Sequence, residues 1–262
     1  MFATHFIDSK TESHAPTIVL AHGVGLDLTM WDDLATRLRD RYRVVQFDAL
    51  GHGETPALPR EAKLADFVEQ VNALIDELHL GKVVLVGFSM GGVVAQSFAL
   101  NHGEKLAGLV LMSTVYQRQA EEQLRVQDRL EKTINEGLEP IADIAIERWF
   151  PEEFQAQHAD AVAAVYQRLC NNDLRGYVDA YRVFGTGDRE IGDRLTEVDC
   201  PALVMTGSED PGSTSAMADL MARDLPQGQV HILPGLRHMV TMQAPQEVAK
   251  LISRFVDNLS EE

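Results

Sequence analysis

Short apolar runs alternate with longer segments of helical periodicity along most of this chain. Each run is too short for a buried helix, is bounded by turn-forming or polar residues, and carries apolar side chains at successive positions. Strands with that pattern are expected to be buried on both faces, as in parallel sheets. The runs that predict strands are 17–22, 43–48, 82–88, 106–113, 202–207 and 229–235.

The segments between these runs carry apolar residues at three- and four-residue steps, which is typical of amphipathic helices. The clearest example spans Leu64 to Leu78 and is followed by Gly81, a residue that commonly ends helices. Further helices are expected at 31–39, 91–100, 215–223 and 245–258. Strands that alternate with helices predict an α/β fold with a mostly parallel sheet covered on both faces.

The alternation stops after Thr114, and no strand pattern occurs from Tyr116 to about Arg194. Residues spaced by three or four positions indicate helices there, with the period continuing past Gly137. They are Val126, Leu130, Ile134, Leu138, Ile141, Ala145 and Trp149. We therefore expect a core formed by residues 1–114 and 196–262, with a helical lid at 115–195 inserted between its two parts.

Composition narrows the class of protein. The chain has 262 residues, of which 45% are hydrophobic, so it can bury a sizeable core. Its 23 basic and 40 acidic residues give a net charge of −17, which disfavours nucleic-acid and anionic-membrane partners. Two cysteines cannot form a disulfide framework, and no apolar run approaches the roughly 20 residues of a membrane span. The first residues lack a signal-peptide pattern. We expect a cytoplasmic protein with a small-molecule substrate, and we leave a homo-oligomer open.

The strongest chemical signal is Gly87–Gly91, a G-x-S-x-G pattern between a predicted strand and a predicted helix. A strand that enters a helix without a loop forces the middle residue, Ser89, into a strained backbone conformation that exposes its hydroxyl. Small residues on both sides permit the close approach of strand and helix. We therefore predict that Ser89 is a nucleophile, although the same pattern also occurs in ordinary small-residue turns.

A serine hydroxyl needs a base, and that base needs an acid to orient it. After this motif the partners are expected in the order acid, then histidine, each just beyond a strand end. Asp210 and His238 meet both conditions, with Glu209 as the alternative acid. The other eight histidines lie before Ser89, inside a predicted strand or on predicted surface elements.

An attacked carbonyl also needs N–H donors for its developing negative charge. We expect one from the residue after the nucleophile, Met90, and one from Val24 in the glycine-containing loop after the first predicted strand. The ring of His22 is expected to hold this loop. The loop at 47–54 contains no G-x-G-x-x-G pattern and no phosphate-binding lysine, so we interpret it as bracing for the site.

Together these motifs resemble those of the α/β-hydrolase superfamily over nearly the whole chain. They are HGVGLD (22–27), DALGHGET (48–55), GFSMGG (87–92), GSEDPG (207–212) and GLRHM (235–239). Segments 25–38, 148–150 and 173–177 are similar to the 3-oxoadipate enol-lactonase group in particular. The resemblance implies the α/β-hydrolase fold with a helical lid. It also implies a serine hydrolase that acts on a lactone or ester from aromatic degradation without a metal or organic cofactor.

The substrate pocket is the least specified part of the sequence. Trp149 and Phe150 are candidates for its lining, although both also fit a lid core, and Met239 follows the predicted base. Arg148 or Arg182 is a candidate for a substrate carboxylate, with a solvated surface position as the alternative for each. Arg237, directly before His238, borders the site.

Three other functions fit the same residues. A general carboxylesterase and a C–C bond hydrolase would use the same serine, histidine and aspartate. A non-catalytic ligand binder is the third, which the complete set of three residues disfavours. Serine rather than aspartate at position 89 argues against haloalkane and epoxide hydrolysis.

Overall fold

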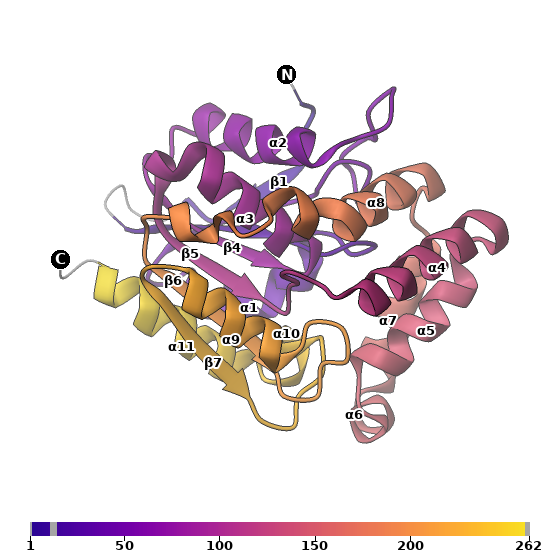
Figure 1. Ribbon diagram of the computed structural model, residues 1–262. Helices are drawn as coiled ribbons and strands as arrows, with labels where there is room; N and C mark the ends of the chain where they lie inside the picture. The colour runs from indigo at the N-terminus through magenta and orange to yellow at the C-terminus, as the bar shows by residue number, and fades with distance from the viewer. Residues whose placement is uncertain (1, 11–14, 260–262) are drawn as a thin grey trace.

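A computed structural model describes residues 2–10 and 15–259, and its centre is a seven-stranded sheet (Figure 1). The strand order is β1-β3-β2-β4-β5-β6-β7. β1 runs antiparallel to β3, and every other neighbouring pair is parallel. The strands are β1 Phe6–Asp8, β2 Thr17–Ala21, β3 Arg43–Phe47, β4 Val83–Phe88, β5 Leu106–Met112, β6 Ala202–Gly207 and β7 Gly228–Leu233.

Helices cover both faces of the sheet. α1 packs against α11 on one face, while α2 packs against α3 on the other (Figure 1). The helices outside the insertion are η1 Leu28–Trp31, α1 Asp32–Leu38, α2 Leu64–Glu77, α3 Met90–His102, η2 Gly103–Lys105, η3 Arg194–Glu197, α9 Ser215–Asp224, α10 Val240–Gln243 and α11 Pro245–Leu259. The predicted α/β architecture is thus confirmed, and β2, β4 and β6 are buried at every position.

Five α-helices lie between β5 and β6, ahead of η3, and we call them the inserted helices. They are α4 Ala120–Glu136, α5 Glu139–Trp149, α6 Glu152–Gln157, α7 Ala159–Cys170 and α8 Leu174–Ile191. α4 to α7 extend to one side of the sheet, while α8 returns along α3 (Figure 1). The division at 1–114, 115–195 and 196–262 stays a prediction.

Two local features differ from the sequence-based expectation. Strand β1 was not expected, because it has only three residues, none of them fully buried, and therefore lacks an apolar run. The helical period across Gly137 is divided between α4 and α5. Gly137 has φ +86°, a left-handed conformation that ends α4, and its N–H bonds to the carbonyl of Thr133.

None of the described helices is long and apolar enough to cross a membrane. The cytoplasmic location and the homo-oligomer considered from the sequence stay predictions.

Candidate active site

Ser89 lies between the last residue of β4 and the first residue of α3, with φ 53° and ψ −113°. A non-glycine residue with positive φ is strained and persists only where its surroundings hold it. The Ser89 N–H donates to the carbonyl of Met112 (3.0 Å), and its carbonyl accepts from the Thr114 hydroxyl (2.6 Å). The neighbouring strand β5 and the chain that follows it thus fix the conformation that the G-x-S-x-G pattern predicts.

The glycines of this motif are required by close approach. A Cβ at Gly87 would lie 2.3 Å from the carbonyl oxygen of Gly91, and a Cβ at Gly91 would lie 2.1 Å from that of Ala21. Side chains at these positions would therefore force strand β4, helix α3 and strand β2 apart. The spacing of the motif follows from this packing.

His238 and Asp210 lie together beyond the ends of β7 and β6. Nδ1 of His238 is 2.6 Å from Oδ2 of Asp210. The second oxygen, Oδ1, accepts from the N–H groups of Gly212 (2.9 Å) and Ser213 (3.0 Å). Glu209, the alternative acid, is exposed. The structure thus brings together the predicted histidine and the first of the two predicted acids.

The environment of Asp210 favours its charged form. Burial by itself raises the pKa of this carboxyl, but the facing His238 and the hydrogen bonds from His238, Ser213 and Gly212 outweigh burial and hold its pKa below the ordinary value. An ionised Asp210 keeps the Nδ1 proton of His238 in place, which leaves Nε2 as the free ring nitrogen.

The ring of His238 lies close to two aromatic side chains. Its centroid lies 4.9 Å from that of Phe88 and 5.5 Å from that of Trp149. Phe88 directly precedes Ser89, and Trp149 ends α5. The inserted helices therefore help to position His238 through Trp149.

The His22–Asp27 loop follows β2 and passes beside Ser89, since a Cβ at Gly23 would lie 3.1 Å from the Cβ of Ser89. Nδ1 of His22 donates to the carbonyl of Gly23 (2.8 Å), while its Nε2 accepts from the N–H of Ala49 (2.9 Å). Burial lowers the pKa of His22, which suits this neutral tautomer. The contacts agree with the predicted loop-holding role of this ring.

His52, a second buried histidine, lies on the loop at 47–54 and contacts the His22–Asp27 loop. Its Nε2 accepts from the N–H of Gly25 (2.9 Å), and its Nδ1 donates to the carbonyl of Leu50 (3.1 Å). Burial and the neighbouring His22 lower the pKa of His52 to about 3, so it is neutral at ordinary pH. The sequence placed His52 near the site, but nothing in its spacing revealed this contact.

A cavity with a volume of about 470 Å³ is lined by Ser89, His238 and Val24. Trp149 and Arg148, two of the residues for which the sequence left alternatives open, line it as well. Phe150 and Met239 are not part of the lining. Both are fully buried, and Phe150 stacks on Phe154. Met90, whose backbone N–H is the predicted donor, is also buried.

Four arginines face this cavity, although the chain as a whole is acidic. They are Arg118, Arg125, Arg129 and Arg148. Arg118 pairs with Asp188 and Arg125 with Glu121. Nη1 of the buried Arg118 has no hydrogen-bond partner.

Arg129 and Arg148 have no carboxylate within ion-pair distance among the described residues. Nε of Arg129 donates to the Tyr181 hydroxyl (2.8 Å). Arg148 lies so close to Gly212 that a Cβ there would be 2.5 Å from its Nη2. Burial lowers the pKa of Arg148, and Arg129 acts in the same direction. A half-buried guanidinium beside another cation favours an anion as its partner.

The other two arginines singled out from the sequence serve elsewhere. Arg182 pairs with Glu61 and Asp179 outside the cavity. Nη1 of Arg237 donates to the carbonyls of Glu147 (2.8 Å) and Phe150 (3.2 Å), which ties the end of α5 to the core.

Sequence reasoning missed the arginines around α4. Arg118, Glu122, Arg125 and Arg129 recur at steps of three and four residues, so they share one face of that segment. This spacing is a usable signal, but only the fold shows that the face lines a cavity. Among residues 2–10 and 15–259, no group of three or more histidine, cysteine or acidic residues is arranged to hold a metal ion.

A model of the Alpha/beta hydrolase family matches residues 18–251 of this chain. The chain therefore belongs to the alpha/beta hydrolase family, which is a class of enzymes. Proteins similar to this chain include an esterase and a lactonase. The fold class expected from the motifs is thereby confirmed.

Two relatives from Acinetobacter baylyi cover most of the chain. (E)-2-((N-methylformamido)methylene)succinate hydrolase is 31% identical over 240 residues, which are 92% of this chain and 90% of the relative. 3-Oxoadipate enol-lactonase 1 is 24% identical and covers 94% of this chain and 90% of its own length. The resemblance to the enol-lactonase group is therefore shown.

Solved structures agree on the fold. An esterase from Thermogutta terrifontis, solved with malate bound, has a TM-score of 0.88 at 29% identity and covers 98% of this chain and 93% of its own. The enol-lactonase from Burkholderia xenovorans LB400 has a TM-score of 0.87 at 24% identity. The match covers 97% of this chain and 96% of the enol-lactonase.

Proposed function

We propose that this protein is a serine hydrolase that cleaves a small ester or lactone bearing a carboxylate, through an acyl-enzyme. The observation that carries the proposal is the pairing of His238 with Asp210 at a cavity that Ser89 also lines, with Ser89 held at positive φ. Ser89 lies at the junction of β4 and α3. A serine in a sharp turn from a strand into a helix has the geometry of a nucleophile elbow.

The reaction begins when Ser89 Oγ attacks the carbonyl carbon and its proton passes to Nε2 of His238. Asp210 holds the Nδ1 proton and stabilises the imidazolium. The carbonyl oxygen becomes an oxyanion that accepts hydrogen bonds from the N–H groups of Met90 and Val24. The C–O bond then breaks, and the leaving oxygen takes the proton from His238.

The second half of the reaction regenerates the serine. A water molecule gives a proton to His238 and attacks the acyl-enzyme, after which Ser89 Oγ leaves and is reprotonated. When the substrate is an enol-lactone, the released enol remains part of the acyl chain and tautomerises to a ketone.

The charge of the cavity supports an anionic substrate. Arg148 lies beside Gly212 and close to Asp210, so it can bind a carboxylate near the reacting carbonyl without another cation entering. Bidentate hydrogen bonding suits a guanidinium and a carboxylate. Two similar relatives carry diacid names, a succinate and an oxoadipate, which is consistent with this charge. We propose an enol-lactone of the 3-oxoadipate type as the substrate.

A second candidate is hydrolysis of an amide-like bond in a substituted succinate. It is favoured by the 31% identity to the (E)-2-((N-methylformamido)methylene)succinate hydrolase, against 24% for the enol-lactonase. The same serine, histidine and arginines would serve, with a nitrogen leaving group in place of oxygen.

The test compares wild type and Ser89→Ala on a matched panel. The panel contains an enol-lactone with a carboxylate, its methyl ester, the formamido-methylene succinate, a short p-nitrophenyl ester and a vinylogous diketone that reports C–C cleavage. We expect the carboxylate-bearing lactone to give the highest kcat/KM, with no turnover by the variant. Labelling of Ser89 by a fluorophosphonate should accompany turnover. A wild-type chain that is neither labelled nor active on any compound would support a binder instead.

A further inference from the structure

The His22–Asp27 loop is held from the core side by the two neutral histidines. His22 fixes the peptide between Gly23 and Val24 through the Gly23 carbonyl, and His52 accepts the N–H of the next peptide, at Gly25. Because a peptide is planar, fixing its carbonyl also fixes the direction of the N–H at its other end. The Val24 N–H is therefore oriented by its own peptide's contact with His22.

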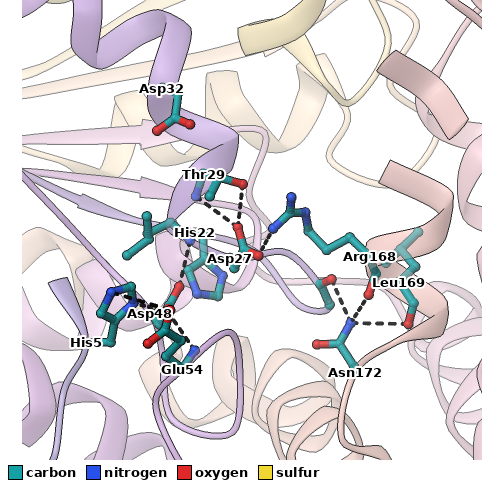
Figure 2. Close-up of polar contacts among 12 residues, drawn as sticks. His5, His22, Asp27, Thr29, Asp32, Asp48, Glu54, Arg168, Leu169 and Asn172 are labelled. Carbon is teal, nitrogen blue, oxygen red and sulfur yellow. Dashed lines mark hydrogen bonds and ion pairs between the residues drawn. The ribbon is translucent and has the colours of Figure 1, made fainter. Parts of the chain in front are cut away.

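The inserted helices hold the next peptide. Nδ2 of Asn172, which lies between α7 and α8, donates to the carbonyl of Gly25 at 2.8 Å (Figure 2). The same nitrogen lies 2.8 Å from the carbonyl of Arg168 and 3.2 Å from that of Leu169. Three surrounding acceptors require the NH₂ side of the amide to face them, which settles its orientation.

The end of the loop carries a second contact with the inserted helices. Arg168 of α7 forms an ion pair with Asp27, whose carboxylate also accepts from the N–H (2.9 Å) and hydroxyl (2.7 Å) of Thr29 (Figure 2). Asp27 is the residue that caps η1. The ion pair therefore joins α7 to the point where the loop enters a helix.

No space separates the loop from the inserted helices at Gly25. This residue has φ +75°, and a Cβ there would lie 2.6 Å from Cδ2 of Leu169 and 2.7 Å from Cε2 of Tyr177. The loop thus packs between the core and α7–α8, and its conformation depends on both.

We propose that Asn172 is a positioning residue for the oxyanion hole: its hydrogen bond to Gly25 holds the loop that presents the Val24 N–H. Arg168 supports the same loop through Asp27. Three consecutive peptides are then held by His22, His52 and Asn172, of which only Asn172 lies among the inserted helices, between α7 and α8. This inference rests on the proposed function, in which Val24 is an oxyanion donor.

The decisive variant is Asn172→Asp, which keeps the shape of the side chain but replaces the donor with a carboxylate facing a carbonyl. Asn172→Ala removes the donor without adding charge, and it replaces the aspartate variant in the test if that variant does not fold. Asn171→Asp and Asn171→Ala are matched controls, because Asn171 is the exposed neighbour and its side chain makes no hydrogen bond among the described residues.

The expected result is a fall in kcat by about 10- to 100-fold in both Asn172 variants, since one oxyanion donor is worth about 10²–10³ and the loop is displaced rather than deleted. KM should stay within about twofold, because the ground-state carbonyl gains little from the donor. The Asn171 controls should match wild type in both constants.

A transition-state analogue separates positioning from general stability. A trifluoromethyl ketone with the substrate's carboxylate forms a tetrahedral adduct with Ser89, so its affinity should fall by the same factor as kcat. The affinity of the carboxylic acid product should not change. A purely structural role would lower the thermal midpoint without this selective loss.

Unchanged kcat and analogue affinity in folded Asn172 variants, or an equal loss in the Asn171 controls, would overturn the inference alone. Wild-type protein that neither binds the ketone nor turns over the panel would overturn the proposed function, and this inference with it.

Discussion

The rim of the sheet and the inserted helices contribute to the same cavity in different ways. At the rim, the candidate groups already have their partners: Asp210 accepts from His238 and from two backbone N–H groups. On the inserted helices, Arg129 and Arg148 face the cavity with no carboxylate of the described residues within ion-pair distance. The candidate reacting groups at the rim are therefore already held in place, whereas we expect an anionic ligand to complete the cationic wall.

The difference between the two regions predicts which groups set the rate of reaction and which set the selectivity for substrates. Preorganised groups at the rim need no rearrangement during reaction, and their removal should reduce turnover for every substrate. The arginines act on one part of the substrate, and their removal should discriminate between charged and neutral substrates. Substitutions of Ser89, Asp210 and Arg148 test this division.

The largest effect is expected for Ser89→Ala. Loss of the attacking hydroxyl removes the acyl-enzyme route, and kcat should fall by about 10⁶-fold with every substrate. Steady-state kinetics with a carboxylate-bearing lactone measure this, and mass spectrometry checks for the acyl-enzyme. Ser208→Ala, at an exposed serine beyond β6, is the control. Activity within tenfold of wild type would remove Ser89 from the mechanism.

Asp210→Asn should reduce kcat by about 10⁴-fold, because an amide cannot stabilise the imidazolium and favours the wrong tautomer. Charged and neutral substrates should be affected alike. Glu209→Gln is the matched control, since it makes the same change one position earlier on an exposed side chain. A larger loss in the Glu209 variant would reassign the acid.

Arg148→Met should raise KM for the carboxylate-bearing substrate by about 10- to 100-fold, because a charge-assisted hydrogen bond is lost. The methyl ester of the same substrate should be hydrolysed with nearly unchanged constants. Paired kinetics on the two compounds measure the selectivity.

Arg182→Met is the control for this prediction, since Arg182 is paired outside the cavity. An equal loss on both compounds in Arg148→Met would show a steric role and weaken the division between rim and wall.

The smallest effect concerns stability at low pH. The pKa of His52 is lowered to about 3 in the folded protein, so the unfolded chain takes up the proton first. The contribution of neutral His52 to the free energy of unfolding is fully present above pH 6.5 and declines as the pH falls from 6.5 toward 3. The pKa of His22 is also lowered, so His22 acts in the same direction.

Urea unfolding at pH 7.5 and pH 5.5 measures this linkage. Relative to His52→Gln, wild type should lose about 1.4 kcal/mol more in the free energy of unfolding at the lower pH. His79→Gln, at an exposed histidine, should behave as wild type. A wild-type loss no larger than that of His52→Gln would show that His52 takes up its proton in the folded state.

Much of the fold was accessible from local patterns. The β2, β4 and β6 runs are buried on both faces, so their sequences are apolar throughout and readily recognised. β1 was missed because it is short and partly exposed, and the break at Gly137 was missed because the apolar period continues across it. Ser89, Asp210 and His238 could be predicted as candidates because each follows a strand, where backbone geometry restricts the sequence.

By itself, the sequence indicated most of the elements, the strained serine, and the positions of the candidate acid and histidine along the chain, because these depend on neighbouring residues. Only the tertiary structure decided that Arg148 lines the cavity while Arg182 does not, that Phe150 lies in the core of the inserted helices, and that Asn172 reaches Gly25. The contact of Asn172 with Gly25 joins residues 147 positions apart, and that of Arg182 with Glu61 joins residues 121 apart. Such contacts depend on how helices pack rather than on any local pattern.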